Sequence, residues 1–294
     1  MIASKLIVFY SVIIPWIWAC QRNGSDPPLQ APAIFDTTPV SAVVHSSITE
    51  ASGIVDSKMN AGFMWVHEDS GTPPRILLLK KDGTLSKAVE VDGATNIDWE
   101  DMSLAKGPDA SLDYIYVADF GDNARARSEY AIYRFPEPGS GVDVVHDADK
   151  IRFKYPDGAH DAEAMVVDNS SRDIYLITKS DNPSRIYKVP FPQNTSTVTE
   201  AILVGEMSFG GATAAAISPD GKEIIIKTYP AVSYFERKAG ETIEAALKKT
   251  PINLPYQLEP QGEAVAFAAD NSGFYTISEK AFSSVVKLYF YKRK

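Results

Sequence analysis

Cysteine and histidine are scarce in this chain of 294 residues, which contains one cysteine, Cys20, and four histidines. One cysteine cannot form a disulfide bond within the chain, so the fold has to be stabilised by burial. Four scattered histidines and a lone cysteine also lack the ligand spacing of a zinc site. These absences exclude a disulfide-stapled domain and argue against zinc.

The motifs of several large enzyme classes are absent as well. The pair His67-Glu68 lacks the second histidine of a helical zinc-protease motif, and no serine stands in a nucleophile elbow. Gly210-Gly211 precedes a predicted strand, whereas phosphate-binding glycine loops precede helices. The sequence therefore assigns no catalytic residue, and His67, Lys179 and Lys227 remain as candidates.

The chain has fewer basic than acidic residues: 29 Lys and Arg against 38 Asp and Glu, which gives a formal net charge of −9. An acidic surface repels nucleic acid and anionic lipid, so both are disfavoured as partners. Such a surface suits a protein that binds a cation. We expect the partner to be a small polar or anionic molecule and the chain to be a monomer.

Long hydrophobic runs are confined to the start of the chain. Residues 6–18 form an apolar run that is broken only by Ser11 and Pro15 and that follows the positive charge of Lys5. A run of this length is too short to span a bilayer and has the layout of a secretory signal. We expect residues 1–19 to be a signal peptide.

The residues that follow the apolar run suggest a lipid anchor. Ala19 before Cys20 resembles a bacterial lipobox, in which the cysteine is acylated, although Trp18 departs from the usual small residue. We therefore expect an exported protein that touches the membrane only through a lipid on Cys20. No aspartate follows the cysteine, which favours the outer membrane. Residues 20–32 are typical of a flexible tether, and residues 33–294 can form one all-β domain.

One pattern recurs five times: an apolar strand that begins near a glutamate, a turn, and a strand that carries an aromatic residue and ends in polar residues. The repeat position holds Glu50, Glu100, Glu163, Thr213 and Glu263. A third strand follows in each repeat, and a fourth, more polar segment follows in most. Four antiparallel strands at a spacing of roughly 50 residues are typical of a β-propeller blade.

The sequence therefore predicts an all-β fold, a propeller of five four-stranded antiparallel blades. A sixth blade remains open if the long second repeat contains a partial one. The last repeat ends after its third strand, so we expect the segment 34–44 to complete it and close the ring. One helix is predicted over residues 241–249. A β-sandwich is the alternative, but its strands do not normally carry the same glutamate and aromatic residue at a fixed phase.

Five phrases of the sequence are specific and occur together: His67-Glu68-Asp69-Ser70-Gly71, Asn96-Ile97-Asp98-Trp99-Glu100-Asp101, Gly121-Asp122-Asn123 with Arg127, Asp161-Ala162-Glu163-Ala164, and Gln261-Gly262-Glu263-Ala264. They resemble a bacterial family of secreted β-propeller lipoproteins that is grouped with NHL-repeat and phytase-like esterase propellers. The resemblance covers essentially the whole mature domain. It implies the fold and export but no catalytic mechanism, since a fold does not convey a function.

The first strand of each propeller blade lines the central axis, so equivalent positions of the repeats meet there. Glu100, Glu163 and Glu263 are therefore expected to form an acidic ring, with Asp98 beside it. Clustered carboxylates repel one another unless they are protonated, paired or bridged by a cation. Because Ca²⁺ accepts oxygen ligands with loose geometry, these four residues are the candidate metal ligands and Ca²⁺ is the candidate cofactor.

Charged residues also gather at the ends of the second strands, where a fold needs residues only for turning. The candidate ligand-binding residues there are Glu68, Asp69, Asp119, Asp122, Asn123, Arg127 and Glu279.

Three roles remain open for the acidic ring. Its carboxylates can be structural latches between blades, ligands of a hard cation, or part of a catalytic site in which a cation polarises an ester or phosphate. The first two roles fit a binding or scaffold propeller of the cell envelope. The third fits a metal-dependent hydrolase of phosphoesters or other esters, of the phytase-like or lactonase-like type.

Overall fold

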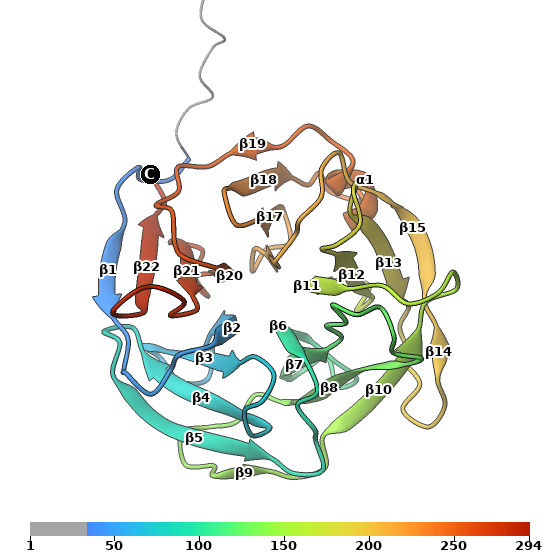
Figure 1. The fold of residues 1–294 in the computed structure, drawn as a ribbon, viewed down its shortest axis with the longest axis horizontal. Helices are drawn as coiled ribbons and strands as arrows, with labels where there is room; N and C mark the ends of the chain where they lie inside the picture. Colours follow the sequence, from blue (N-terminus) through green and yellow to red (C-terminus); the bar gives the residue numbers. More distant parts are fainter. Residues whose placement is uncertain (1–33) are drawn as a thin grey trace, which may run out of the picture. The chain divides into compact units, whose positions relative to one another are not determined.

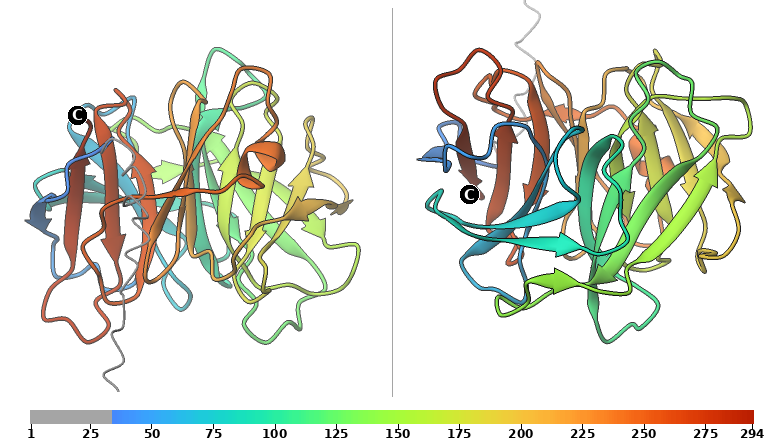
Figure 2. Two further views of the ribbon diagram at one scale, coloured as in Figure 1. Left: turned by 90° about the horizontal axis from the view of Figure 1, so that it is seen from above. Right: turned by 60° about the horizontal axis from the view of Figure 1, so that its bottom comes forward.

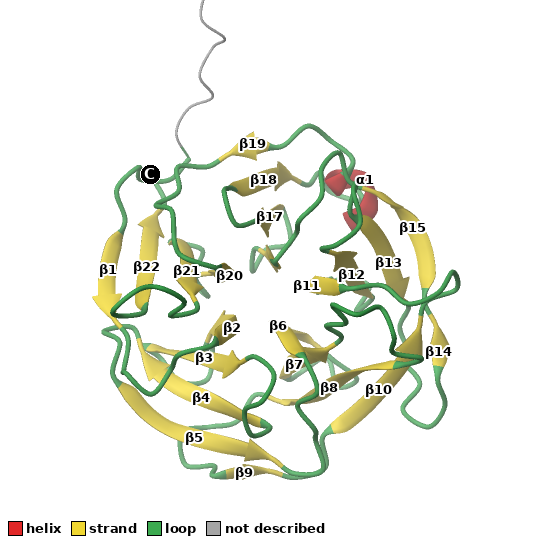
Figure 3. Cartoon of the chain, in the orientation of Figure 1, coloured by secondary structure: helices red, strands yellow, loops and turns green. Residues whose placement is uncertain are grey.

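The computed structural model describes residues 34–294, and the expected signal peptide, lipidated Cys20 and tether lie outside these residues. The described part is a ring of five β-sheets around a central axis (Figure 1). Strands dominate, and the one helix of these residues lies at the rim (Figure 3). The predicted all-β propeller of five blades is confirmed.

Each blade has four antiparallel strands, ordered from the axis outward. Blade 1 contains β2 (Ala51–Asp56), β3 (Phe63–Glu68), β4 (Arg75–Lys80) and β5 (Leu85–Val91). Blade 2 contains β6 (Trp99–Lys106), β7 (Asp113–Asp119), β8 (Tyr130–Pro136) and β10 (Asp149–Lys154). Blade 3 contains β11 (Ala162–Val167), β12 (Ile174–Thr178), β13 (Arg185–Val189) and β15 (Ile202–Glu206).

The last two blades follow the same plan. Blade 4 contains β16 (Ala214–Ile217), β17 (Glu223–Lys227), β18 (Val232–Glu236) and β19 (Ile252–Asn253). Blade 5 contains β20 (Gly262–Phe267), β21 (Gly273–Ser278), β22 (Lys287–Lys292) and β1 (Val40–Val43). The strands run from one face of the ring to the other, so the axis has two mouths (Figure 2). We call the mouth at which the inner strands begin the upper mouth.

The ring is closed as the sequence predicts. Strand β1 pairs antiparallel with β22, from Val40 opposite Phe290 to Val43 opposite Lys287. A further bridge joins Phe35 to Arg293. Because the first strand fills the outer place of the last blade, that blade has no open edge at the point of closure.

Two short strands also join neighbouring blades at the rim. Strand β9 (Val144–Val145) lies in the connection between β8 and β10 of blade 2 and pairs in parallel with β5 of blade 1. Strand β14 (Thr199–Glu200) belongs to blade 3 and pairs in parallel with β10 of blade 2. The long second repeat therefore contains a strand of the neighbouring sheet and no sixth blade.

The apolar core is divided into five clusters, each between two adjacent blades. Helix α1 (Ile243–Leu247) buries Ile243, Ala246 and Leu247 in the cluster between blades 3 and 4. The helix is shorter than predicted at both ends, because Thr242 is its N-cap, which accepts a hydrogen bond from the backbone N–H of Ala245, and Lys248 is its C-cap. No helix among residues 34–294 is long and apolar enough to span a membrane.

Candidate functional site

The repeat glutamates occupy a β-bulge at the start of the inner strands. The pairing register shifts around Glu100, Glu163 and Glu263 in blades 2, 3 and 5. Such a bulge turns a side chain out of the sheet, so these three carboxylates face the upper mouth. Blade 1 has the same bulge at Ser52, which means that Glu50 lies two residues before the repeat position.

Three carboxylates from blades 1 and 2 come together at this mouth. Asp69 follows β3, Asp98 precedes β6 and Glu100 occupies the bulge of β6. One oxygen of each lies within 4.8 Å of the other two, which is close enough for one metal ion to be bound by all three. We call Asp69, Asp98 and Glu100 the acidic triad. Sequence reasoning placed Asp98 and Glu100 among the metal ligands and Asp69 among the ligand-binding residues.

Keeping the three carboxylates of the acidic triad ionised costs free energy when no cation is bound. Burial raises the pKa of Glu100 well above its usual value, and the charge of Glu163 raises it further. Burial and the neighbouring charge of Asp69 raise the pKa of Asp98 to about 6. Glu100 is 6% exposed, and no hydrogen bond or ion pair to its side chain is found among residues 34–294. Its carboxylate is therefore free to accept a ligand.

Glu163 and Glu263 lie beside the triad but already have partners. The Lys179 ammonium is 2.5 Å from Oε1 of Glu163 and donates to the Tyr229 hydroxyl at 3.0 Å. Tyr229 donates in turn to Oε1 of Glu263 at 2.7 Å. The second oxygen, Oε2, of each glutamate is buried and has no partner in the described part of the chain. Of the four predicted metal ligands, two thus belong to the triad and two to a chain through Lys179 and Tyr229.

Several predicted ligand-binding residues have structural contacts in the loops around the mouth. Glu68 accepts a hydrogen bond from the backbone N–H of Thr49 at 3.0 Å. Arg127 donates to Asp119 at 3.1 Å and to the carbonyl of Gly121 at 3.0 Å.

Asp122 holds the loop between β7 and β8 in place. It accepts hydrogen bonds from the backbone N–H groups of Ala126 and Arg127, both at 2.9 Å, and from the Tyr130 hydroxyl. These bonds account for Asp122 without a ligand, and Asn123 is exposed on the same loop.

Two of the candidate catalytic residues are enclosed. Burial lowers the pKa of His67 to about 4, and its ring lies against Gly53, where a Cβ would be 2.7 Å from His67 Cδ2. Lys227 is fully buried and lies 2.6 Å from the Tyr256 hydroxyl and 3.5 Å from Glu259. Only Lys179 of the three lies in the mouth beside the carboxylates.

Glu279 completes the acidic mouth. Burial and the charges of Glu263, Glu50 and Asp69 raise its pKa to about 8. Lys179 is bonded to Glu163, while Arg127 lies near Asp98 and Lys227 near Glu263. Carboxylates still outnumber cations at the mouth, which holds the triad, Glu163, Glu263 and Glu279.

We expect the metal-free protein to lose stability as the pH rises from about 6 to about 8. The folded-state pKa of Glu279, about 8, lies above its unfolded value, so folding takes up a proton in this interval, whereas at lower pH the lowered pKa of His67 opposes the raised pKa of Asp98. Thermal unfolding in a chelator at several pH values measures the effect. Glu279→Gln should flatten the upper part of the profile, and a melting temperature that rises through this interval would contradict the assignment.

Asp101, to which the sequence analysis assigned no role, connects the inner strands of three blades, and we call it the central tie of the ring. Its fully buried carboxylate accepts hydrogen bonds from the backbone N–H groups of Met102 at 2.8 Å, Met165 at 2.8 Å and Ala215 at 3.1 Å. These donors lie on the inner strands of blades 2, 3 and 4. The latch role that the sequence left open for the repeat glutamates thus belongs to the residue after one of them.

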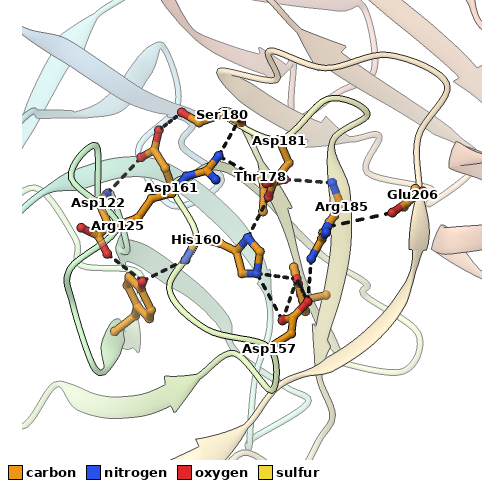
Figure 4. A network of polar contacts seen from close by, with 12 residues as sticks. Asp122, Arg125, Asp157, His160, Asp161, Thr178, Ser180, Asp181, Arg185 and Glu206 are labelled. Carbon is orange, nitrogen blue, oxygen red and sulfur yellow. Dashed lines mark hydrogen bonds and ion pairs between the residues drawn. The ribbon is translucent and has the colours of Figure 1, made fainter.

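A second network that the sequence did not predict supports the loop of Lys179 (Figure 4). His160 lies between two carboxylates, with Nδ1 2.8 Å from Asp181 and Nε2 3.2 Å from Asp157. Arg125 reaches across from blade 2 and donates to the carbonyl of Ser180 at 2.7 Å. These contacts hold the residues that directly follow Lys179, and only the phrase around Asp161 signalled this region in the sequence.

One hollow lies on the upper face at blade 4, and another lies at the axis. A groove of about 480 Å³ borders Tyr229 on the upper face, between the loops of blades 3 and 4. A narrow cavity of about 50 Å³ lies at the lower mouth and is lined largely by apolar residues of the inner strands, such as Met102, Val167 and Val265. The lower cavity contains none of the carboxylates of the upper mouth.

No protein-family model matches this chain, and no curated protein matches it. Among solved structures, an auxiliary nutrient binding protein from Bacteroides thetaiotaomicron is similar, with a TM-score of 0.50 and 7% identity over 87% of this chain and 78% of that chain. A luciferin-regenerating enzyme has a TM-score of 0.48 and 10% identity over 87% of this chain and 95% of that one. What the chain shares with the nutrient binding protein is its fold.

Proposed function

We propose that this chain is a propeller of the cell envelope that binds a divalent cation at its upper mouth and, next to the cation, a small polar ligand. The observation that carries the proposal is the acidic triad, in which the buried carboxylate of Glu100 has no hydrogen-bond or ion-pair partner within residues 34–294. Export through residues 1–19, a lipid on Cys20, and membership of the family of secreted propeller lipoproteins belong to the same proposal.

The donor set of the triad fits Ca²⁺ best. It consists of carboxylate oxygens alone, which hard cations prefer, and Ca²⁺ takes six to eight oxygens with loose geometry. Three carboxylates leave coordination positions for water and for a ligand. Burial and then mutual repulsion raise the pKa values of Asp98 and Glu100, and a bound cation would relieve that repulsion.

We expect calcium to raise the melting temperature of the chelator-treated protein. At a calcium concentration about 100 times the dissociation constant, the gain in stability is about 2.7 kcal/mol. Glu100→Gln should abolish this gain and, because it removes one of several repelling charges, should leave the metal-free protein as stable as the wild type or more so. Calorimetric titration and thermal unfolding with and without calcium measure both effects.

Glu129→Gln is the matched control, since Glu129 is an exposed glutamate of the β7–β8 connection and lies outside the triad. This variant should keep the full response to calcium. A wild-type protein whose unfolding does not respond to calcium would refute the proposed function.

Metal-dependent ester or phosphoester hydrolysis is the second candidate, and one observation favours it. The unpartnered Oε2 of Glu163 is a base close to the triad, and Lys179 can hold a substrate oxygen. A cation in the triad would supply electrophilic polarisation of the substrate. A screen of phosphoesters and lactones tests it: turnover that Glu163→Gln removes without changing calcium binding would establish an enzyme.

A further inference from the structure

The groove beside Tyr229 has the size of a small-molecule site. Its volume of about 480 Å³ lies within the range of ligand pockets in proteins, about 300–1,000 Å³. Its walls come from the β15–β16 connection, the β17–β18 connection and the segment at β19, and include Phe209, Tyr229, Pro230 and Pro251. Tyr229 is 37% exposed, although its hydroxyl is hydrogen-bonded to Glu263.

Tyr229 links this groove to the acidic mouth. Its hydroxyl accepts from Lys179 at 3.0 Å and donates to Glu263 at 2.7 Å, and Lys179 is bonded to Glu163. Glu163 occupies the bulge of β11, and Glu100 of the acidic triad occupies the bulge of the neighbouring β6, to which β11 is tied by the hydrogen bond from Met165 to Asp101. The triad, Lys179 and Tyr229 therefore lie at one mouth, and Tyr229 also lines the groove.

The charges of the mouth select the chemistry of the ligand. Six carboxylates gather at the mouth, and the three cations near them already have carboxylate partners. Lys179 is bonded to Glu163, Arg127 to Asp119, and Lys227 to Glu259. Even with a divalent cation bound, carboxylate oxygens remain in excess, including the unpartnered Oε2 atoms of Glu163 and Glu263. Such a site repels anions and is satisfied by hydrogen-bond donors, of which neutral hydroxyl groups have the lowest desolvation cost.

We propose that the ligand is a carbohydrate or a related polyol, bound through its hydroxyl groups at the cation site and through its apolar face along Tyr229. This inference rests on the proposed cation site. Hydroxyl oxygens can complete the coordination of the cation, and their protons can be donated to the free carboxylate oxygens. The exposed part of the Tyr229 ring offers the apolar surface on which the C–H face of a sugar ring packs.

Calorimetry with a panel of common monosaccharides and disaccharides, in calcium and in chelator, tests this inference. We expect at least one sugar to bind in calcium and to lose its binding in chelator. Ala231→Trp places a bulky side chain in the groove and should lower the affinity for that sugar by about tenfold or more. The affinity for calcium should change by less than about twofold. Ala110→Trp, at an exposed alanine of the β6–β7 connection, is the matched control and should change neither affinity.

The outcomes separate this inference from the proposed function. If calcium binds but no sugar of the panel does, or if inorganic phosphate or methylammonium binds in place of sugars, the carbohydrate assignment is overturned and the cation site stands. If sugar affinity is unchanged in Ala231→Trp, the groove is not the binding surface and the inference is wrong. If calcium itself does not bind, the proposed function is refuted, and this inference, which rests on the cation site, is refuted with it.

Discussion

Replacing Asp101 by alanine should lower the stability of this propeller by about 3–5 kcal/mol and its melting temperature by roughly 10 °C. The carboxylate accepts three backbone N–H groups from the inner strands of blades 2, 3 and 4. Without it, these donors remain in an interior that is closed to water, and each unpaired buried donor costs about 1–3 kcal/mol. Thermal and urea unfolding of the two proteins measure the loss.

Ser103→Ala on the same strand is the matched control. The Ser103 hydroxyl donates to the carbonyl of Met165 at 3.2 Å, so this variant also loses a contact between blades 2 and 3, but only one neutral hydrogen bond. It should cost about 1 kcal/mol. If Asp101→Ala unfolds at the temperature of Ser103→Ala, the central tie described here does not hold the ring together.

Replacing Gly121 by alanine should weaken calcium binding by about 10–100-fold without removing any ligand atom. A Cβ at this position would overlap Oε1 of Glu100 and lie 2.5 Å from Oδ2 of Asp98. Both carboxylates would have to move, and the acidic triad would lose the close approach of its oxygens. Calorimetric titration with calcium measures the loss, and sugar binding should disappear with it.

Gly141→Ala is the control for this substitution, because a Cβ at Gly141 meets no atom within 4 Å. It should leave calcium affinity unchanged. Gly121→Ala should also melt close to the wild type in chelator, since its main effect falls on the triad. Calcium affinity equal to that of the wild type in Gly121→Ala would show that Asp98 and Glu100 do not bind the ion together.

The propeller could be predicted from the sequence because its signals are local and repeated. Each blade carries its own strand pattern and turn residues, and the missing outer strand of the last repeat indicated where β1 belongs. The parallel strands β9 and β14 were not predicted, because two-residue pairings between blades leave no pattern in the sequence.

The candidate site could be predicted only in outline. Equal phase in the repeats brought Glu100, Glu163 and Glu263 to one mouth, but phase says nothing about the partners that each side chain finds. Two of the three glutamates have partners, since Lys179 is bonded to Glu163 and Tyr229 to Glu263. Asp69, at the end of a different strand, lies close to the third, Glu100. The role of Asp101 depends on backbone donors of two other blades, which no local pattern reveals.

The two rim strands have a mechanical consequence. Strand β9 ties blade 2 to blade 1, strand β14 ties blade 3 to blade 2, and β1 clasps the ends of the chain within blade 5. Blade 4 has no such tie in the described part of the chain, and its outermost strand, β19, spans only Ile252–Asn253. Amide hydrogens of blade 4 should therefore exchange with solvent before those of blades 1 to 3. We therefore expect blade 4, which borders the groove beside Tyr229, to open more readily than blades 1 to 3.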